Sequence, residues 1–339
     1  MSDKFKFELF TLDQLDVNEY NNVIGKSVFT TIPWIKFVEQ DSKAIPLFVR
    51  ITDDLDRFVG YFSALKITRF GVRIVGSPFR GWSTCFMGID TEFKSMKIDI
   101  YKPLVDFLFR EIKCQYIEIC DRDISVELAK KNGITALPID TLELDIDKDD
   151  AGLFKQMKTD CRNFIRQFER RGARIEIAEP DDLFAEDYYE QLKDVFAKQG
   201  LVPTYSLDKV KVLLRSLKNT EEIFCVRVIS PDGRCIATSI FPGYKDKFFF
   251  WGGASYRPDQ HYRPNEYMIW TAIKYWRDKG CTKFDMVGAR DYKRKFGPRD
   301  QQYANMIFAR PRILIKGRML AEKLYFVYIG IKGKILRKK

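Results

Sequence analysis

The residues best suited to chemistry lie between Phe248 and Phe296. An apolar run at residues 248–251 predicts a buried strand, and Gly252 and Gly253 follow it directly. Because glycine has no Cβ, this pair lets a ligand or another backbone approach the strand end closely. A predicted helix beginning near Asn265 directs its first amides back toward that opening, where they can hold a phosphate or carboxylate. We interpret Gly252, Gly253 and Asn265 as candidate cofactor-binding residues.

The next predicted strand lies at residues 284–287, and a strongly basic loop follows it. Ligands of open α/β sheets gather outside the carboxyl ends of strands, so this loop is expected to line the same site. Lys293 is its candidate catalytic residue, and the candidate substrate-binding residues are Arg290, Tyr292 and Lys295. The alternative interpretation of Lys293 is a solvated surface lysine.

Three further residues are candidates for catalysis. Asp285 can act as the general base that deprotonates an amine, although its alternation with Phe284 and Met286 also fits a buried acid paired with an arginine. His261 lies on the loop before the predicted anion-binding helix. A histidine on a loop often has no part in catalysis, and this is the alternative interpretation. Tyr256 can bond to ligand oxygens or simply pack.

Two arginines lie upstream on a predicted basic helix at residues 152–171. Arg162 and Arg166 are four residues apart and therefore share one helix face. Such a pair suits a phosphate clamp, so both are candidate substrate-binding residues. A solvated basic helix is the alternative.

The chemistry that these residues suit is acyl transfer. Attack of an amine on a thioester or ester needs a neutral amine, a donor to the oxyanion and good alignment. Backbone amides on a strand edge near Gly252 can supply that donor, so few side chains are required.

The elements that position these residues predict an α/β fold of the mixed, α+β type. In the first half, strands are expected at residues 44–52, 57–65, 72–75 and 116–120, with helices from Pro103 and at 125–132. In the second half, helices are expected at 152–171, 181–199, 206–218 and 265–279, and strands at 142–146, 223–229, 234–241, 247–251 and 284–287.

A weak internal repeat relates the two halves. Each copy reads as a helix end, a cysteine and a buried strand with one acid; the copies are Arg110, Glu111, Cys114, Ile117, Glu118, Ile119 and Arg277, Asp278, Cys281, Phe284, Asp285, Met286. The pattern favours duplication of one α/β unit. We predict domains at residues 1–140 and 141–310 and a basic tail at 311–339.

Composition narrows the possible classes. A chain of 339 residues is long enough for two domains. Seven single cysteines without a CxxC pair and one histidine argue against a zinc site, so no metal is expected, and they fit a reduced cytoplasm. The sequence shows neither a run of about 20 apolar residues nor a secretory core near its start.

The net charge of +11 is concentrated at the end of the chain. Residues 310–339 hold ten basic residues and a single acid, Glu322. Such a tail can meet anionic lipid or nucleic acid, or it can serve solubility alone. We therefore expect a cytoplasmic protein with a possible peripheral contact at the inner face of the membrane.

The segment YKRKFG at residues 292–297 resembles the FKxxFG motif of the Fem-type peptidoglycan aminoacyltransferases, with Tyr in place of Phe. The same family and its CelD-like acyltransferase relatives have segments similar to PNEYMIW with KFDMVGA, and to CRNFIR in the basic helix. Near the start of the chain, Ile32-Pro33-Trp34 resembles the family's early Trp segment. The resemblance implies two tandem GNAT-like domains, the first degenerate. It also implies that Lys293 contacts acceptor phosphates and that part of 311–339 packs on the first domain.

The function implied is transfer of an acyl group to an amine of a cell-envelope sugar or a lipid- or nucleotide-linked precursor that bears phosphate. We expect acyl-CoA as the cosubstrate, because the coiled-coil arm of the branch that uses tRNA is missing. The first alternative is a Fem-like aminoacyltransferase that uses aminoacyl-tRNA and thus binds tRNA; the second is a non-catalytic protein that binds a glycan precursor. Two departures leave the donor open. The sequence shows no sustained heptads of a coiled-coil arm, and residues 255–264 lack the glycines of the Gln/Arg-x-x-Gly-x-Gly/Ala loop.

Overall fold

The computed structural model describes residues 4–198, 200–321 and 324. The chain separates into two compact units, which we describe one at a time. Among the described residues, unit 1 comprises 4–140 and 302–321, and unit 2 comprises 141–198, 200–301 and 324. The predicted mixed α/β fold is confirmed. Most of the predicted basic tail, at 322–323 and 325–339, lies outside the described residues.

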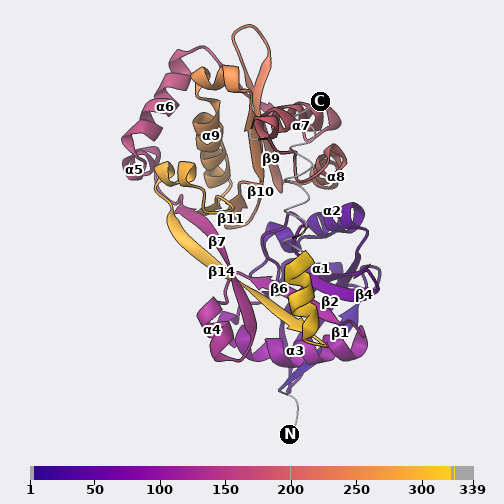
Figure 1. Ribbon diagram of the computed structural model, residues 1–339. Helices are drawn as coiled ribbons and strands as arrows, with labels where there is room; N and C mark the ends of the chain where they lie inside the picture. The colour runs from indigo at the N-terminus through magenta and orange to yellow at the C-terminus, as the bar shows by residue number, and fades with distance from the viewer. Residues whose placement is uncertain (1–3, 199, 322–323, 325–339) are drawn as a thin grey trace. The chain divides into compact units, whose positions relative to one another are not determined.

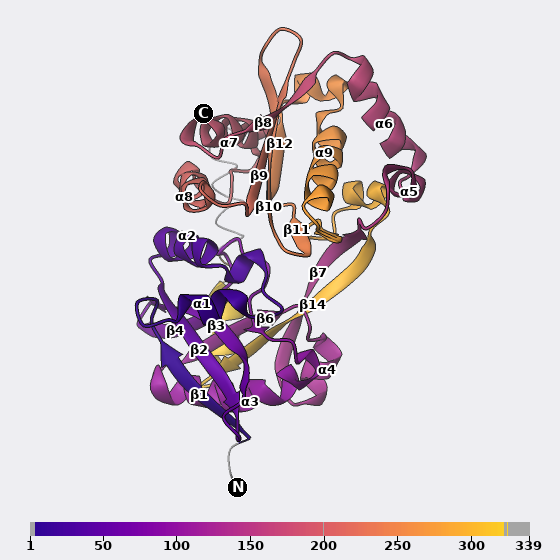
Figure 2. The ribbon, with the colours of Figure 1, turned by 180° about the vertical axis from the view of Figure 1, so that it is seen from behind.

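Unit 1 is a mixed sheet in the order β1-β2-β3-β4-β6-β14. All neighbours are antiparallel except β4 and β6. Helix α3 packs into the main apolar core, and Figures 1 and 2 show α1 and α2 on the other side of the strands. The elements are β1 (Phe5–Phe10), α1 (Val17–Asn22), η1 (Val28–Thr30), α2 (Ile32–Ser42), β2 (Ile45–Asp53), β3 (Phe58–Arg69), β4 (Val72–Ser77), β5 (Ile89–Asp90), η2 (Lys94–Met96), α3 (Lys97–Glu111), β6 (Tyr116–Asp121), α4 (Val126–Lys131) and, shared with unit 2, β7 (Thr135–Asp145) and β14 (Arg299–Ala309).

Unit 2 is a second mixed sheet in the order β7-β13-β11-β10-β9-β8, with β12 beside β10. Helix α9 covers one face of β9 and β10, and α7 and α8 lie on the other (Figures 1 and 2). The elements are α5 (Asp150–Gln156), α6 (Thr159–Arg170), β8 (Arg174–Ala178), α7 (Asp182–Ala197), α8 (Leu207–Leu217), β9 (Ile223–Ile229), β10 (Cys235–Tyr244), β11 (Lys247–Phe249), β12 (Gly252–Ser255), η3 (Arg257–Tyr262), α9 (Pro264–Asp278), β13 (Lys283–Asp285) and η4 (Asp291–Phe296).

The two units repeat one arrangement. In each, a helix joins two parallel strands: α3 lies between β4 and β6, and α9 lies between β11 and β13. The acids of the internal repeat take matching places, because Glu118 pairs with Gly76 in unit 1 and Asp285 pairs with Phe249 in unit 2. The repeat in the sequence thus corresponds to a repeat in the fold.

Several predicted elements were wrong in extent. Helix α3 begins at Lys97, so Pro103 lies inside it, because the buried face already includes Ile100. The helix predicted at 152–171 is broken at Met157, which is extended and separates α5 from α6. The strand predicted at 247–251 is interrupted at residues 250–251. Strands β1, β5, β8 and β12 were not predicted.

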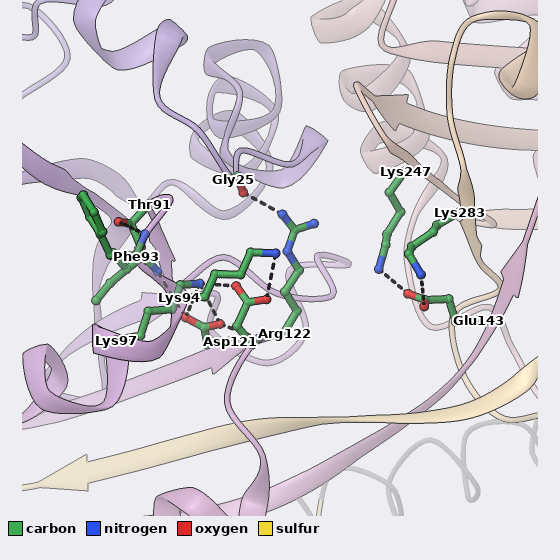
Figure 3. A network of polar contacts seen from close by, with 12 residues as sticks. Gly25, Thr91, Phe93, Lys94, Lys97, Asp121, Arg122, Glu143, Lys247 and Lys283 are labelled. Carbon is green, nitrogen blue, oxygen red and sulfur yellow. Dashed lines mark hydrogen bonds and ion pairs between the residues drawn. The ribbon is translucent and has the colours of Figure 1, made fainter. Parts of the chain in front are cut away.

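A buried ion cluster joins β7, β11 and β13 inside unit 2. Lys247 Nζ lies 2.5 Å from a Glu143 carboxylate oxygen, and the side chains of both are less than a tenth exposed. Lys283 adds a bond of 3.3 Å to the same carboxylate (Figure 3), and Arg299 adds one of 2.5 Å. Burial raises the pKa of Glu143, but the charge of Lys247 and the bonds to Arg299 and Lys283 outweigh burial and lower it to about 2.

We expect Glu143→Gln to lower the free energy of unfolding by about 3 kcal/mol at neutral pH, because Lys247 is left buried without its carboxylate. The folded-state pKa lies below the ordinary value of 4.5, so the stabilisation is present above that pH and is lost as pH falls toward 2. Denaturant titrations of both proteins across this range measure it.

Asp300→Asn is the matched control, because Asp300 forms an exposed pair with Arg294 and its removal should cost less than about 1 kcal/mol. A loss in Glu143→Gln that equals the control, or that does not change with pH, would contradict the prediction.

Candidate functional site

The parallel pairing of β11 and β13 ends abruptly within unit 2. Its last bond runs from Phe250 N to Asp285 O, at 3.0 Å. Strand β13 then stays with β7, since Met286 N bonds to Leu142 O at 2.8 Å. Beyond that point the other chain segment continues as β12, which pairs with β10 alone in the part of the chain that the structure describes. We call the side of residues 252–255 that faces away from β10 the β12 edge.

Backbone amides are directed toward the β12 edge. Phe250 N donates to β13, and Trp251 N donates to Ile240 O of β10 at 3.1 Å. Successive N–H groups along a strand point to opposite sides. The Trp251 bond is one residue out of the register in which Gly252 lies opposite Ile240. Within that register Tyr256 N donates to Ile236 O of β10 at 3.0 Å. Alternation back from Tyr256 therefore directs the N–H groups of Gly253 and Ser255 away from β10. This is the place where the sequence predicts a backbone donor for an oxyanion.

Both glycines of the predicted pair are required by the packing of this chain. A Cβ on Gly252 would lie 2.2 Å from the Tyr188 hydroxyl, and one on Gly253 would lie 2.9 Å from Ser239 Oγ. Close approach at this position was predicted, but the approaching groups are side chains of α7 and β10. Ser239 Oγ also donates to Gly252 O at 2.9 Å, which ties β12 to β10.

Sequence reasoning missed an aromatic cluster beside these glycines. The hydroxyl groups of Tyr188 and Tyr205 lie 2.6 Å apart, and both rings lie near Trp251, the residue that precedes Gly252. Burial raises the pKa of Tyr205 to about 12 and holds the pKa of Tyr188 well above its usual value, so both hydroxyls are neutral at pH 7. The signal that could have found the cluster is the bulky Trp251 directly before two glycines.

Asp285 ends β13 and is buried. One of its oxygens accepts from Thr141 Oγ1 at 2.5 Å and from Val287 N at 2.9 Å. Gly288 N donates to the same threonine hydroxyl at 3.2 Å. The carboxylate is thus held by β7 and by the turn after β13.

Lys293 is 4% exposed, so its interpretation as a solvated lysine was wrong. Its ammonium donates to the carbonyl oxygens of Met286 and Val287, both at 2.6 Å, and lies 5.0 Å from the centre of the Phe250 ring. Lys293 therefore holds the end of β13 next to the residue where β11 and β12 divide. Its contact with acceptor phosphates stays a prediction.

The other loop candidates take different positions. Lys295 forms an ion pair with Glu266, in the first turn of α9. Arg290 and Tyr292 are exposed. The structure thus brings Lys293 to the division of the strands, pairs Lys295 with α9, and leaves Arg290 and Tyr292 accessible.

The start of α9 differs from the predicted one. Arg263 is the N-cap, in the left-handed region and without a side-chain cap, and Pro264 occupies the first turn. Asn265 Oδ1 instead accepts from Ser255 Oγ at 3.1 Å, which ties the helix to the end of β12. His261 is exposed on η3, where its Nδ1 lies 2.9 Å from Pro258 O. Tyr256 follows β12, and its backbone N bonds to Ile236 O at 3.0 Å.

The two arginines of α6 have structural contacts. Arg162 donates to Phe154 O at 3.2 Å and to Met157 O at 2.9 Å, so its guanidinium closes the break between α5 and α6. Arg166 lies 5.8 Å from the centre of the Phe154 ring. The guanidinium of Arg162 therefore already bonds to carbonyl oxygens at the helix junction. These bonds weaken its interpretation as part of a phosphate clamp.

Unit 1 fills the place that corresponds to the β12 edge. Beyond Ser77 the chain returns to β6, where Met87 N bonds to Cys120 O at 3.0 Å. Asp121 lies at the end of β6 and pairs with Lys97, the first residue of α3, at 3.1 Å (Figure 3). A Cβ on Gly88 would lie 2.5 Å from Asp121 Oδ2, so these groups are in close contact. Side chains of unit 1 occupy the region where a ligand would meet the helix start.

The described part of the chain lacks two kinds of feature. No group of three or more His, Cys, Asp or Glu side chains in it could hold a metal ion. No described helix is long and apolar enough to span a membrane.

Comparison with known proteins identifies the fold of this site. Residues 155–294, all within unit 2, match the family model of the acetyltransferase (GNAT) domain. No curated protein sequence matches the chain. Unit 2 therefore contains a GNAT domain, which is the fold of GNAT-type acyltransferases.

Solved structures extend the likeness over both units. The crystal structure of FemX has a TM-score of 0.72 and 13% identity, with coverage of 91% of this chain and 99% of that chain. L-PGS from Bacillus licheniformis has a TM-score of 0.50 and 14% identity, with coverage of 80% and 87%. A conserved protein of unknown function from Bacteroides thetaiotaomicron has a TM-score of 0.55 and 12% identity, with coverage of 90% and 99%. At these identities the likeness establishes the fold alone, and the predicted tandem GNAT-like architecture is confirmed.

We expect Gly252→Ala to lower the free energy of unfolding by about 1–3 kcal/mol, because the added methyl displaces the Tyr188 hydroxyl. Tyr188→Phe removes that hydroxyl, so the double variant should recover most of the loss that Gly252→Ala causes. A double-mutant cycle from denaturant titrations measures the coupling. Additive effects of the two substitutions would show that the hydroxyl is not the obstacle.

Proposed function

We propose that unit 2 is an N-acyltransferase that takes an acyl group from acyl-CoA and transfers it to an amine of a cell-envelope sugar or of a lipid- or nucleotide-linked precursor. The observation that carries this proposal is the β12 edge. Its outward N–H groups lie where β12 has left β13, so an extended donor can lie beside β12 as an additional strand would. The GNAT domain that contains this edge supports the assignment to acyl transfer.

The reaction needs only groups that this edge and its neighbours offer. The acceptor nitrogen attacks the donor carbonyl carbon, the carbon–sulfur bond breaks, and the sulfur leaves as a thiolate that takes up a proton. Backbone N–H groups of Gly253 and Ser255 stabilise the oxyanion that forms during attack. In this proposal Asp285 receives the proton of the amine, directly or through one water.

The acceptor is proposed to bear phosphate, and the exposed Arg290 after β13 supports this. We place the reaction in the cytoplasm. The support is that all seven cysteines are free, as expected in a reducing compartment.

Aminoacyl-tRNA is the second candidate donor, and the start of α9 favours it. An anionic pyrophosphate binds well to free amides at a helix N-terminus. Here Pro264 offers no amide, and the Glu266 carboxylate already lies in the first turn, paired with Lys295. A donor whose phosphates lie elsewhere would avoid this carboxylate.

A thermal-shift screen with acetyl-CoA, longer acyl-CoAs and aminoacyl-tRNA tests the donor. A ligand at about 100 times its Kd stabilises the folded state by about 2.7 kcal/mol, so the true donor should raise the Tm by several degrees. A shift with acyl-CoA and none with charged tRNA supports the first candidate. The reverse result replaces it with the second, and no shift with either contradicts the proposal that a donor lies at the β12 edge.

We expect Asp285→Asn to lower kcat by about 10²-fold or more, since the amide cannot accept the proton. The amide oxygen can still accept from Thr141 and from Val287 N, so the fold should be retained. The measurement is the rate of acyl transfer from the donor that the screen identifies.

Glu118→Gln is the matched control, because Glu118 takes the equivalent place in unit 1. We expect it to leave kcat unchanged. Equal losses in both variants would point to a structural role for Asp285, and the absence of turnover in the unaltered protein would favour the non-catalytic alternative.

A further inference from the structure

A fully exposed phenylalanine forms the tip of the β3–β4 hairpin in unit 1. Phe70 has a relative exposure of 106% and lies in the left-handed region with φ 49°, followed by Gly71 with φ 76°. Two such residues in a two-residue hairpin turn favour Asn-Gly, because bulky side chains are unfavourable there. Phe70 therefore bears a conformational cost that no burial against the described residues offsets.

The hairpin around Phe70 carries charge of a single sign. Residues 64–81 contain four basic residues and no acid: Lys66, Arg69, Arg73 and Arg80. Arg69, Arg73 and Arg80 are exposed. An exposed aromatic tip thus lies among cations.

A second basic segment packs against the base of this hairpin. Residues 313–321 are helical (the yellow helix of Figure 1). Leu314 and Ile315 join an apolar cluster that also contains Ile67 and Val72 of the hairpin strands. The helix and the hairpin are therefore parts of one surface of unit 1.

The helix combines exposed aliphatic residues with cations. Ile313, Met319 and Leu320 are each exposed by more than two fifths, and Arg312 and Lys316 are also exposed. Residues 310–321 contain no acid. Within this segment Arg310 is engaged by Asp106 at 2.6 Å, so we do not count it among the available cations.

We propose that the hairpin tip and this helix form a docking surface for an anionic lipid membrane, with Arg69, Phe70, Arg73, Ile313, Lys316 and Leu320 as its principal residues. Phe70 and the aliphatic residues enter the interfacial region, and the cations meet lipid headgroups. Exposed aliphatic side chains favour lipid over nucleic acid, because they cannot stack on bases as aromatic rings do. The inference goes beyond the proposed acyl transfer and does not depend on the donor.

The other exposed hairpin tip of unit 1 has the opposite character. Leu55, between β2 and β3, is 68% exposed, but its turn contains Asp53, Asp54 and Asp56. These carboxylates would be repelled by anionic lipid. Leu55 therefore offers a matched control for Phe70.

Sedimentation of the full chain with vesicles tests the proposal. The chain should bind vesicles that contain phosphatidylglycerol more strongly than vesicles of phosphatidylcholine alone, and less strongly as salt rises. Phe70→Asn should weaken binding by about tenfold, with no loss of Tm because asparagine suits the turn. Leu55→Asn should bind as the unaltered protein does, and the double variant R69E/R73E should weaken binding by more than about tenfold at low salt.

Three results would overturn the proposal. One is equal binding to both kinds of vesicle, and another is equal binding by Phe70→Asn and Leu55→Asn. The third is tRNA binding that Phe70→Asn weakens in the absence of vesicle binding, which would assign the surface to nucleic acid.

Discussion

The candidate site depends on one backbone hydrogen bond, from Phe250 N to Asp285 O, with which the parallel pairing of β11 and β13 ends. A parallel strand that kept this partner would leave no free edge. Because the chain turns toward β10 at Trp251, the amides of Gly253 and Ser255 are left for a ligand. Lys293 holds the end of β13 at the same place, by bonds to two consecutive carbonyl oxygens. The opening is thus fixed from both strands.

Local patterns predicted much of this arrangement. Capping residues such as Ser125 and Ser206 mark helix starts as the sequence suggested, and the glycine pair marked the division of the strands. Contacts between residues far apart in the sequence could not be predicted from these local patterns. Nothing near Gly252 in the sequence indicates that Tyr188 is the side chain that requires it. Strand β8 was missed for the same reason, since α7 and α8 separate it in the sequence from its pairing partner β9. Spacing placed Arg162 and Arg166 on one face but could not reveal that Arg162 holds a helix junction.

The duplicated arrangement explains why chemistry is assigned to one unit. Both units place a helix after a strand and return to a parallel neighbour, so each has a position where a strand edge can open. In unit 1 that position is occupied by the return of the chain at Met87 and by the Lys97–Asp121 pair. Buried charges of this kind contribute little net stability compared with an apolar core but are costly to separate. Opening unit 1 to a ligand would require that separation, whereas the β12 edge of unit 2 needs no such step.

The exchange of terminal strands makes unit 2 depend on residues outside the matched GNAT segment. Strand β7 begins in unit 1 and supplies Thr141 and Glu143, which bond to Asp285 and to Lys247. Both precede residue 155, where the family match begins. Strand β14 runs the other way and completes the sheet of unit 1 beside β6. Each unit is therefore completed by a strand that begins in the other unit. The positions of Asp285 and Glu143 follow from the fold of the whole chain rather than from the GNAT domain alone.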